Sequence, residues 1–262
     1  MLKLEGRIVA VTPIVHSGGN EGISTLLRRE VFIIDGKPIR VPVISGNAIR
    51  GVLRRIVAKA MLELLECEPT QLPPLAYHLL HDGGIIQEAV HVEPDVDFLR
   101  QVRALLPNIS LFGGCVRQTP LSGRLIVSPA VPICKETQPY TGIDSVLSLS
   151  DIVGEIMFTR RDDREGEKLP DAVQMRYFVE CFNAGTEFVH SFIVKSNVPQ
   201  EIGALHLAIQ RFTECPYLGA RSAVGLGKVS WTYKADAKLV TAFEKFVKQH
   251  KTEILNILHS LG

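Results

Sequence analysis

Apolar and polar residues alternate over residues 2–11, 26–34 and 39–44, and this period of two predicts three β-strands. Asp35 and Gly36 separate the second run from the third and form a typical hairpin turn pair. From residue 47 the period changes to 3.6, which predicts a helix that continues to about residue 65. Ser45 or Asn47 can cap this helix, because each offers a side-chain oxygen to the free amides of the first turn.

The rest of the chain continues this mixture of strands and helices. Residues 123–130 and 229–233 are predicted strands, residues 176–195 a β-hairpin that turns at 183–186, and residues 199–214 and 235–261 amphipathic helices. Residues 16–20 are predicted to form a flexible loop. Two insertions interrupt the order: an acidic helical segment at about 63–108, and a charged segment at about 135–175 that we expect to project as a thumb-like hairpin.

Without the insertions, the order of elements is strand, helix, strand, hairpin, helix, strand. This order predicts an α+β fold with a ferredoxin-like, RRM-like core, elaborated within a single domain over residues 1–262. Many unrelated functions share such a core, so the fold alone does not identify a function.

Charge is strongly segregated along the chain, although the formal net charge is only +1. Residues 36–62, 98–135 and 215–235 hold six, five and three basic residues and no acidic one, whereas residues 63–97 hold eight carboxylates and no Lys or Arg. Because salt limits each field to roughly 8 Å, a basic surface for a polyanion can coexist with an acidic region elsewhere. The sequence therefore favours a polyanionic partner such as a nucleic acid.

Other chemistries receive less support from the sequence. The five cysteines are scattered and form no Cys-x-x-Cys pair, so we expect no zinc site, no disulfide framework, and a reducing cytoplasm. No apolar run is long enough to cross a bilayer, and we expect no membrane partner and no cofactor. The glycines at 219, 225 and 227 follow a helix and precede a strand, which is the reverse of the nucleotide-binding loops.

Four motifs in order resemble those of the CRISPR-associated RAMP superfamily. They are Val-Ile-Ser-Gly-Asn-Ala-Ile-Arg-Gly-Val-Leu-Arg at 43–54, Leu-Phe-Gly-Gly at 111–114 followed by Arg-Leu-Ile-Val-Ser at 124–128, Ala-Gly-Thr-x-Phe at 184–188, and the glycine-rich loop at 219–227. Their arrangement is most similar to the seventh Cas family, the repeated backbone subunit that coats a guide RNA, in its type IV form and next in its type III form.

This resemblance implies a subunit that oligomerises along crRNA, joins other CRISPR effector subunits, and presents the guide for pairing with a target nucleic acid. The first-helix region, the loop after the first strand and the glycine loop would follow the guide phosphates, and the thumb would kink the guide. Together with the basic stretches, it gives the expected RNA-binding residues as His16, Ser17, Ser45, Asn47, Arg50, Arg54, Arg55, Arg124, Arg160, Arg161, Met175, Arg221, Ser222 and Lys228.

One departure from the family pattern concerns catalysis. Type III backbone subunits carry an RNA-cutting Asp in the loop after the first strand, and the matching position here falls near Ser24 and Thr25. We therefore expect a catalytically silent subunit. Three alternatives stay open: target cleavage that uses Glu21 or Asp35 with a metal, guide processing with His16 as general base, and an oligomer that binds no RNA.

Overall fold

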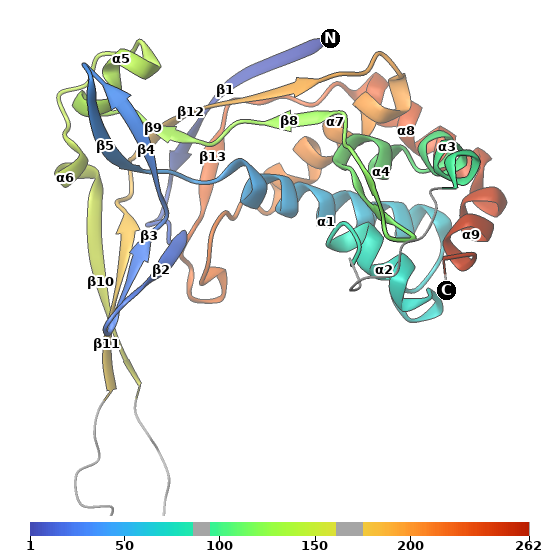
Figure 1. The fold of residues 1–262 in the computed structure, drawn as a ribbon, viewed down its shortest axis with the longest axis horizontal. Helices are drawn as coiled ribbons and strands as arrows, with labels where there is room; N and C mark the ends of the chain where they lie inside the picture. The colour runs from blue at the N-terminus through green and yellow to red at the C-terminus, as the bar shows by residue number, and fades with distance from the viewer. Residues whose placement is uncertain (86–94, 161–174, 262) are drawn as a thin grey trace, which may run out of the picture.

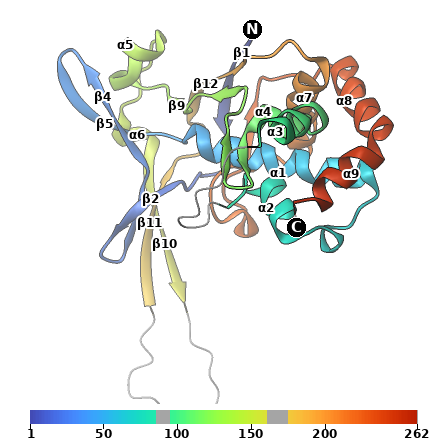
Figure 2. The same ribbon diagram turned by 45° about the vertical axis from the view of Figure 1, so that its right-hand side comes forward.

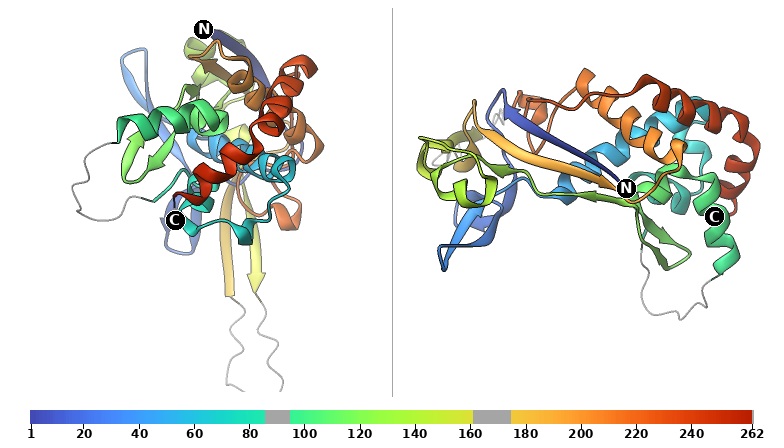
Figure 3. Two further views of the ribbon diagram at one scale, coloured as in Figure 1. Left: turned by 90° about the vertical axis from the view of Figure 1, so that its right-hand side faces the viewer. Right: turned by 90° about the horizontal axis from the view of Figure 1, so that it is seen from above.

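The computed structural model describes residues 1–85, 95–160 and 175–261, and it has a mixed α+β fold with several sheets (Figure 1). The largest sheet described contains β1 (Leu2–Ala10), β8 (Leu125–Val127), β12 (Glu187–Val194) and β13 (Val229–Trp231), in the order β13-β1-β12-β8. The short strand β9 (Val131–Pro132) also pairs with β12, and all of these pairings are antiparallel. Figure 3 shows β1 and β12 side by side.

Helices α1 (Gly46–Leu65) and α7 (Pro199–Glu214) cover one face of this sheet. Burial alternates along β12, where Phe188, His190, Phe192 and Val194 are buried and the side chains between them are partly exposed. This period of two is the expected signature of a strand with one face against a core. The main core therefore lies between the sheet and the helices.

A second sheet projects from the body of the molecule (Figures 1 and 2). It contains β10 (Val153–Arg160), β11 (Met175–Phe182), β3 (Ser24–Leu27) and β2 (Ser17–Glu21), in the order β10-β11-β3-β2. Residues 16–20, predicted to be a flexible loop, thus mostly belong to strand β2. We call the β10–β11 hairpin the thumb. At its base, Arg29 donates to both carboxylate oxygens of Glu180, at 2.8 and 2.7 Å.

The predicted hairpin over residues 176–195 is wrong, because β11 pairs with β10 and β12 pairs with β1. The backbone of the intervening turn is bonded to β1: Gly185 N–H donates to Ala10 O, and Ala10 N–H donates to Thr186 O. The chain therefore passes from one sheet into the other at this turn. A local turn signal cannot distinguish that crossing from a hairpin.

The hairpin predicted at Asp35-Gly36 is confirmed as β4 (Arg29–Ile34) and β5 (Lys37–Pro42). The single strand expected over 26–34 is divided, however, and its first part is β3 in the thumb sheet. Beside this hairpin, residues 135–152 form short helices, η2 (Lys135–Thr137), α5 (Gln138–Thr141) and α6 (Leu149–Ile152). The thumb thus begins only at Val153, later than the sequence pattern suggested.

A helical lobe occupies the other end of the molecule. It holds η1 (Pro69–Gln71), α2 (Pro74–His81), α3 (Val96–Leu105), α4 (Pro107–Phe112), and the short hairpin β6 (Gly114–Val116) and β7 (Thr119–Leu121). The single helix predicted over 235–261 is two, α8 (Ala237–Gln249) and α9 (Lys251–His259), which meet at His250. None of the helices in the described residues has the length and apolar content needed to span a membrane.

Candidate nucleic-acid interface

The N-terminus of α1 is fixed by a chain of hydrogen bonds. Ser45 caps the helix, because its Oγ accepts from the N–H of Ala48 at 3.3 Å. The Ser45 N–H in turn donates to Nε2 of His16 at 3.1 Å, and Ser45 Oγ lies 3.1 Å from the same nitrogen. His16 therefore ties the segment after β1 to the start of α1.

The environment of His16 favours its neutral form. Burial lowers the pKa of His16, and the positive charge of Arg28 lowers it further. A neutral ring with Nε2 as the acceptor fits the Ser45 N–H donor. His16 thus acts first as a structural anchor, and its ring nitrogen Nε2 already has a partner inside the protein.

The glycine-rich loop packs against the same segment. Ala220 N–H donates to Val15 O, and Gly227 N–H donates to Pro13 O, both at 2.8 Å. Gly219 has a φ of +86°, and a Cβ at this position would lie 2.3 Å from Val15 O. Only glycine fits both the left-handed backbone and this close approach. The three separate segments around residues 16, 47 and 219 are thereby held together.

A groove of about 460 Å³ lies between these segments, and we call it the α1 groove. Its walls come from the loop after β1, the outward face of α1, the glycine loop and the end of α2. The lining side chains with polar or charged groups are His16, Ser17, Asn47, Arg50, Arg54, Arg55, His81 and Asp82. The groove thus unites six of the residues predicted from sequence, and Ser45, the cap of α1, is bonded to one of them, His16.

Two of the arginines in the groove wall are engaged with the protein itself. Arg54 is only 8% exposed and donates to the carbonyls of Gly113 and Phe112, at 2.7 and 2.9 Å, which closes the C-terminal end of α4. Arg50 donates through Nη2 to the carbonyl of Leu125 in β8. The sequence predicts Arg54 as an RNA-binding residue, but the end of α4 covers most of its side chain. Its contact with RNA stays a prediction.

Burial changes the electrostatics of this pair without removing its charge. It lowers the pKa of Arg50, and it lowers the pKa of Arg54 to about 10, with repulsion from Arg50 as a second cause. Arg54 is therefore still protonated near neutral pH. Both guanidinium groups contribute positive potential to the wall, while Asn47 and Arg55 are the exposed groups of α1 that a ligand can reach first.

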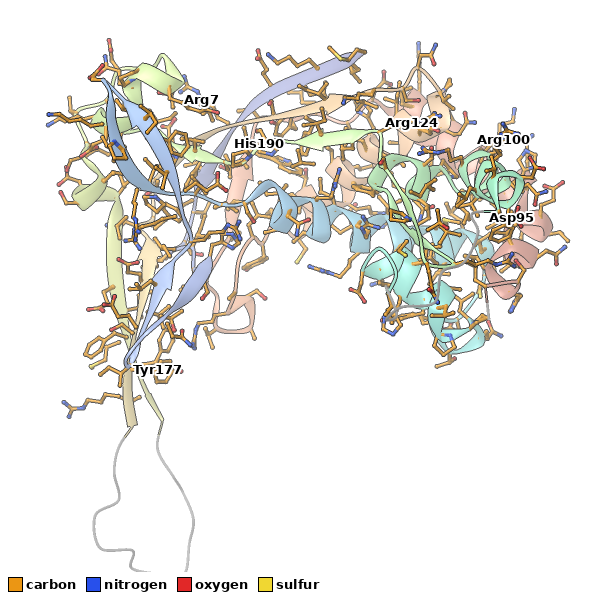
Figure 4. All side chains as sticks on the ribbon, viewed as in Figure 1. Arg7, Asp95, Arg100, Arg124, Tyr177 and His190 are labelled. Atoms are coloured by element: carbon orange, nitrogen blue, oxygen red, sulfur yellow. The ribbon has the colours of Figure 1, made fainter. Side chains whose placement is uncertain are left out.

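Arg221 lies against the thumb, near the end of its described part. Its guanidinium carbon is 4.3 Å from the ring centroid of Phe158, and Nη1 donates to the Tyr177 hydroxyl at 3.1 Å. The rings of Phe158 and Tyr177 are stacked at 5.5 Å. Figure 4 shows Tyr177 near the end of the described thumb. Arg221 therefore links the glycine loop to the thumb, in addition to any contact with RNA.

Arg124 lies in the helical part of the molecule, far from Tyr177 (Figure 4). Its Nη1 donates to both carboxylate oxygens of the buried Glu201, at 2.8 and 2.9 Å, and Ser110 Oγ donates to the same carboxylate at 2.7 Å. Arg124 does not line the α1 groove. Its guanidinium is thus committed to a structural ion pair.

The remaining predicted residues lie outside the groove. Ser222 and Lys228 are exposed on the glycine loop. Arg160 and Met175 are paired across the two strands of the thumb at the end of the described hairpin. Arg161 lies outside the described residues.

His81 and Asp82, which were not among the residues predicted from sequence, close the groove at the end of α2. Asp82 accepts a hydrogen bond from Nδ1 of His78 at 3.2 Å. A signal was present, because Pro73 and Pro74 mark a helix start and the buried Ala76, Leu79 and Leu80 give it an apolar face. The acidic composition of 63–97 instead suggested a region that faces away from the groove.

No protein-family model matches the chain, and no curated protein is similar to it in sequence. Among solved structures, the fold is similar to a chain of a "Type IV-B CRISPR Complex", with a TM-score of 0.65 and 23% sequence identity. The match covers 90% of this chain and 92% of the other. The two chains therefore share a fold over nearly their whole lengths.

Proposed function

We propose that this protein is a guide-RNA-binding backbone subunit of a CRISPR ribonucleoprotein complex of the type IV kind. Several copies would coat one crRNA and present its bases for pairing with a target nucleic acid, with specificity carried by Watson–Crick pairing. The fold shared with a chain of the type IV-B complex supports this assignment. The four sequence motifs support it independently, because they were identified without reference to the fold.

We also infer that the main sheet is a ferredoxin-like core. Its elements follow the order β1, α1, β8, β12, α7, β13, and the sheet order is β13-β1-β12-β8. Numbered along the core, this is the antiparallel order 4-1-3-2 of the split βαβ arrangement. The helical lobe and the thumb are then insertions into that core, as the sequence pattern suggested.

The α1 groove is the observation that carries the proposed RNA binding. It combines a capped helix N-terminus, the buried Arg54, the partly buried Arg50 and the exposed Asn47 and Arg55 along one wall. Helix N-termini and arginines favour phosphate groups. Phosphate contacts supply affinity without base recognition, so the subunit would bind guides of any sequence.

We further propose that the subunit does not cut RNA. Neither Glu21 nor Asp35 lines the α1 groove: Glu21 pairs with Ser24 at the tip of the β2–β3 hairpin, and Asp35 occupies the β4–β5 turn with a φ of 50°. Among the described residues that line the groove, Asp82 is the one carboxylate. Cleavage through Asp82, or guide processing through His16, is therefore the alternative that the experiment must address.

We also propose that the β4–β5 hairpin contacts a neighbouring subunit. It extends beside α5, away from the helical lobe (Figure 1), and its side chains Val31 and Ile33 are 63% and 69% exposed. Adjacent exposed apolar side chains of this kind are typical of protein–protein contact sites. Assembly along a guide would bury them.

Titration of the purified protein with single-stranded RNAs of unrelated sequence tests the proposal. We expect similar affinities for all sequences, a steep loss of affinity with salt, and a copy number that rises with RNA length in native mass spectrometry. Arg55→Ala should weaken binding to every RNA and lessen the salt slope by about one unit. Arg100→Ala is the matched control, because Arg100 is exposed on α3 and does not line the groove.

The results of these experiments distinguish the proposed function from its alternatives. Failure to bind RNA at low salt would overturn the proposal, and a single copy per guide at all lengths would overturn the backbone role. Incubation of the assembled complex with Mg²⁺ and a matched target RNA should leave the target intact. If the target is cleaved and Asp82→Asn abolishes the cleavage, the protein is a type III-like nuclease. If the protein cuts a repeat RNA and His16→Ala abolishes that cutting, it is a guide-processing enzyme.

A further inference from the structure

A second cavity, of about 700 Å³, adjoins the α1 groove, and we call it the α2 cavity. It lies between the second half of α1, the segment around η1, and α2. Its lining residues are Arg55, Lys59, Leu62, Glu63, Glu66, Cys67, Glu68, Pro69, Tyr77 and His81. Arg55 and His81 line both cavities, so a ligand in the groove can continue into the α2 cavity past these two side chains.

An aromatic pair forms one side of this passage. The rings of Tyr77 and His81 are stacked, with centroids 4.1 Å apart and planes 20° apart. His81 Nδ1 donates to the backbone carbonyl of Tyr77 at 3.0 Å, which holds the ring in place. Tyr77 is 36% exposed, so a ligand in the cavity can reach its ring. The pair is a preorganised flat surface of the kind on which nucleobases stack.

Charge within the α2 cavity changes sign over a short distance. Arg55 and Lys59 are exposed one turn apart on α1, and Glu63, Glu66 and Glu68 follow at the far end. Cations favour a phosphate next to the α1 groove, and the carboxylates repel any further phosphate. The cavity therefore suits a single nucleotide that leaves the phosphate path, and not the continuing RNA backbone.

From this arrangement we infer that the α2 cavity holds one unpaired nucleotide of the RNA in the α1 groove. The phosphate lies between Arg55 and Lys59, and the base stacks on the Tyr77–His81 pair. The exocyclic amino group of an adenine, guanine or cytosine can donate to the carboxylates at the far end, whereas uracil has no such group. The inference rests on the proposed RNA binding, and it adds a base-contacting site to a protein otherwise expected to contact phosphates.

The test compares Tyr77→Ala and Tyr77→Phe with wild type in RNA titrations over a range of salt concentrations. Loss of one base-stacking contact should weaken binding of Tyr77→Ala by roughly 5-fold to 150-fold. The salt slope should not change, because stacking releases no counterions. Tyr77→Phe keeps the ring and should bind like wild type. Tyr140→Ala is the matched control, since Tyr140 is 58% exposed on α5, away from both cavities.

Photocrosslinking gives an independent readout of position. Single-stranded RNA that carries one photoreactive base should crosslink to the α2 peptide that contains Tyr77 and His81, and Tyr77→Ala should lose this crosslink. Wild-type RNA binding with no crosslink on α2 and no effect of Tyr77→Ala would overturn the base site and leave the proposed function intact. Absence of RNA binding by wild type would overturn both. If wild type crosslinks on α2 but Tyr77→Ala lessens the salt slope of RNA binding, the substitution has changed the path of the RNA phosphates. That result would also refute the stacking role.

Discussion

Substitution of Arg124 distinguishes a structural role for this arginine from a role in RNA binding. Arg124 was predicted to bind RNA, yet its guanidinium is paired with Glu201, whose side chain is only 4% exposed. Replacement by Met keeps most of the aliphatic length and removes the charge. We predict that Arg124→Met destabilises the fold and leaves RNA binding unchanged.

The magnitude follows from the environment of the pair. Loss of one partner of a buried ion pair costs about 3–5 kcal/mol. Here Arg124 is 36% exposed, so water can replace part of its interaction. Glu201 also keeps the bond from Ser110 and lies in the first turn of α7, where the helix dipole stabilises a negative charge. We therefore expect a loss of about 2 kcal/mol, which lowers Tm by roughly 4–8 °C in a chain of this size.

Urea and thermal unfolding measure this loss, and RNA titration well below Tm measures binding. Glu201→Gln in the Arg124→Met background should restore part of the stability, because an amide still accepts from Ser110 without a buried charge. Arg55→Ala should show the opposite behaviour, with wild-type Tm and weaker RNA binding. The reasoning fails if Arg124→Met unfolds at the wild-type Tm and lessens the salt slope of binding.

Two further predictions concern titration and the thumb. Burial lowers the pKa of His190 from 6.5 to about 4, so the unfolded chain binds the proton first as the pH falls. The free energy of unfolding should therefore decrease as the pH falls from 6.5 towards 4, and the titration of His190 should account for about 2 kcal/mol of this decrease at pH 5. Urea unfolding measures it: the free energy of unfolding of His190→Asn should depend less on pH than that of wild type, and an equal dependence would refute this. At the thumb, Arg221→Asn keeps a residue that tolerates the left-handed backbone (φ 66°) and removes the contacts with Phe158 and Tyr177. It should cost about 1–2 kcal/mol, measured by thermal unfolding, and an unchanged Tm would argue against this link.

Features with a local physical cause were predictable from the sequence. Helix α1 and its cap at Ser45 depend on a 3.6-residue period and one side-chain oxygen, both visible within a few residues. The β4–β5 hairpin depends on Asp35 and Gly36, whose backbones both have positive φ. The helix at 199–214 and the strand at 229–233 were predictable for the same reason, whereas the hairpin over 176–195 was not correct.

Which strands pair, and which arginines are covered by other parts of the protein, depends on segments far apart in the sequence. β1 pairs with β12, some 180 residues later, and no pattern within 183–186 shows that the chain changes sheets there. Arg54 lies on the polar face of α1 by periodicity, but the carbonyl groups of residues 112 and 113 cover that face. A hydrophobic pattern shows where polar side chains are, whereas only the tertiary structure shows which of them have protein partners.

The arginines of the basic stretch over 36–62 therefore differ in role, because some have protein partners and others are exposed. Arg50 and Arg54 carry their charge into the groove wall while their donors hold the carbonyls of Leu125, Gly113 and Phe112. Their field attracts a polyanion even though α1 has more accessible contacts in Asn47 and Arg55. Removal of Arg54 would therefore release α4 from α1 as well as reduce the positive potential, and a loss of RNA binding in that variant would not identify a phosphate ligand. Arg55, exposed and shared by both cavities, is the residue whose substitution reports on RNA contact itself.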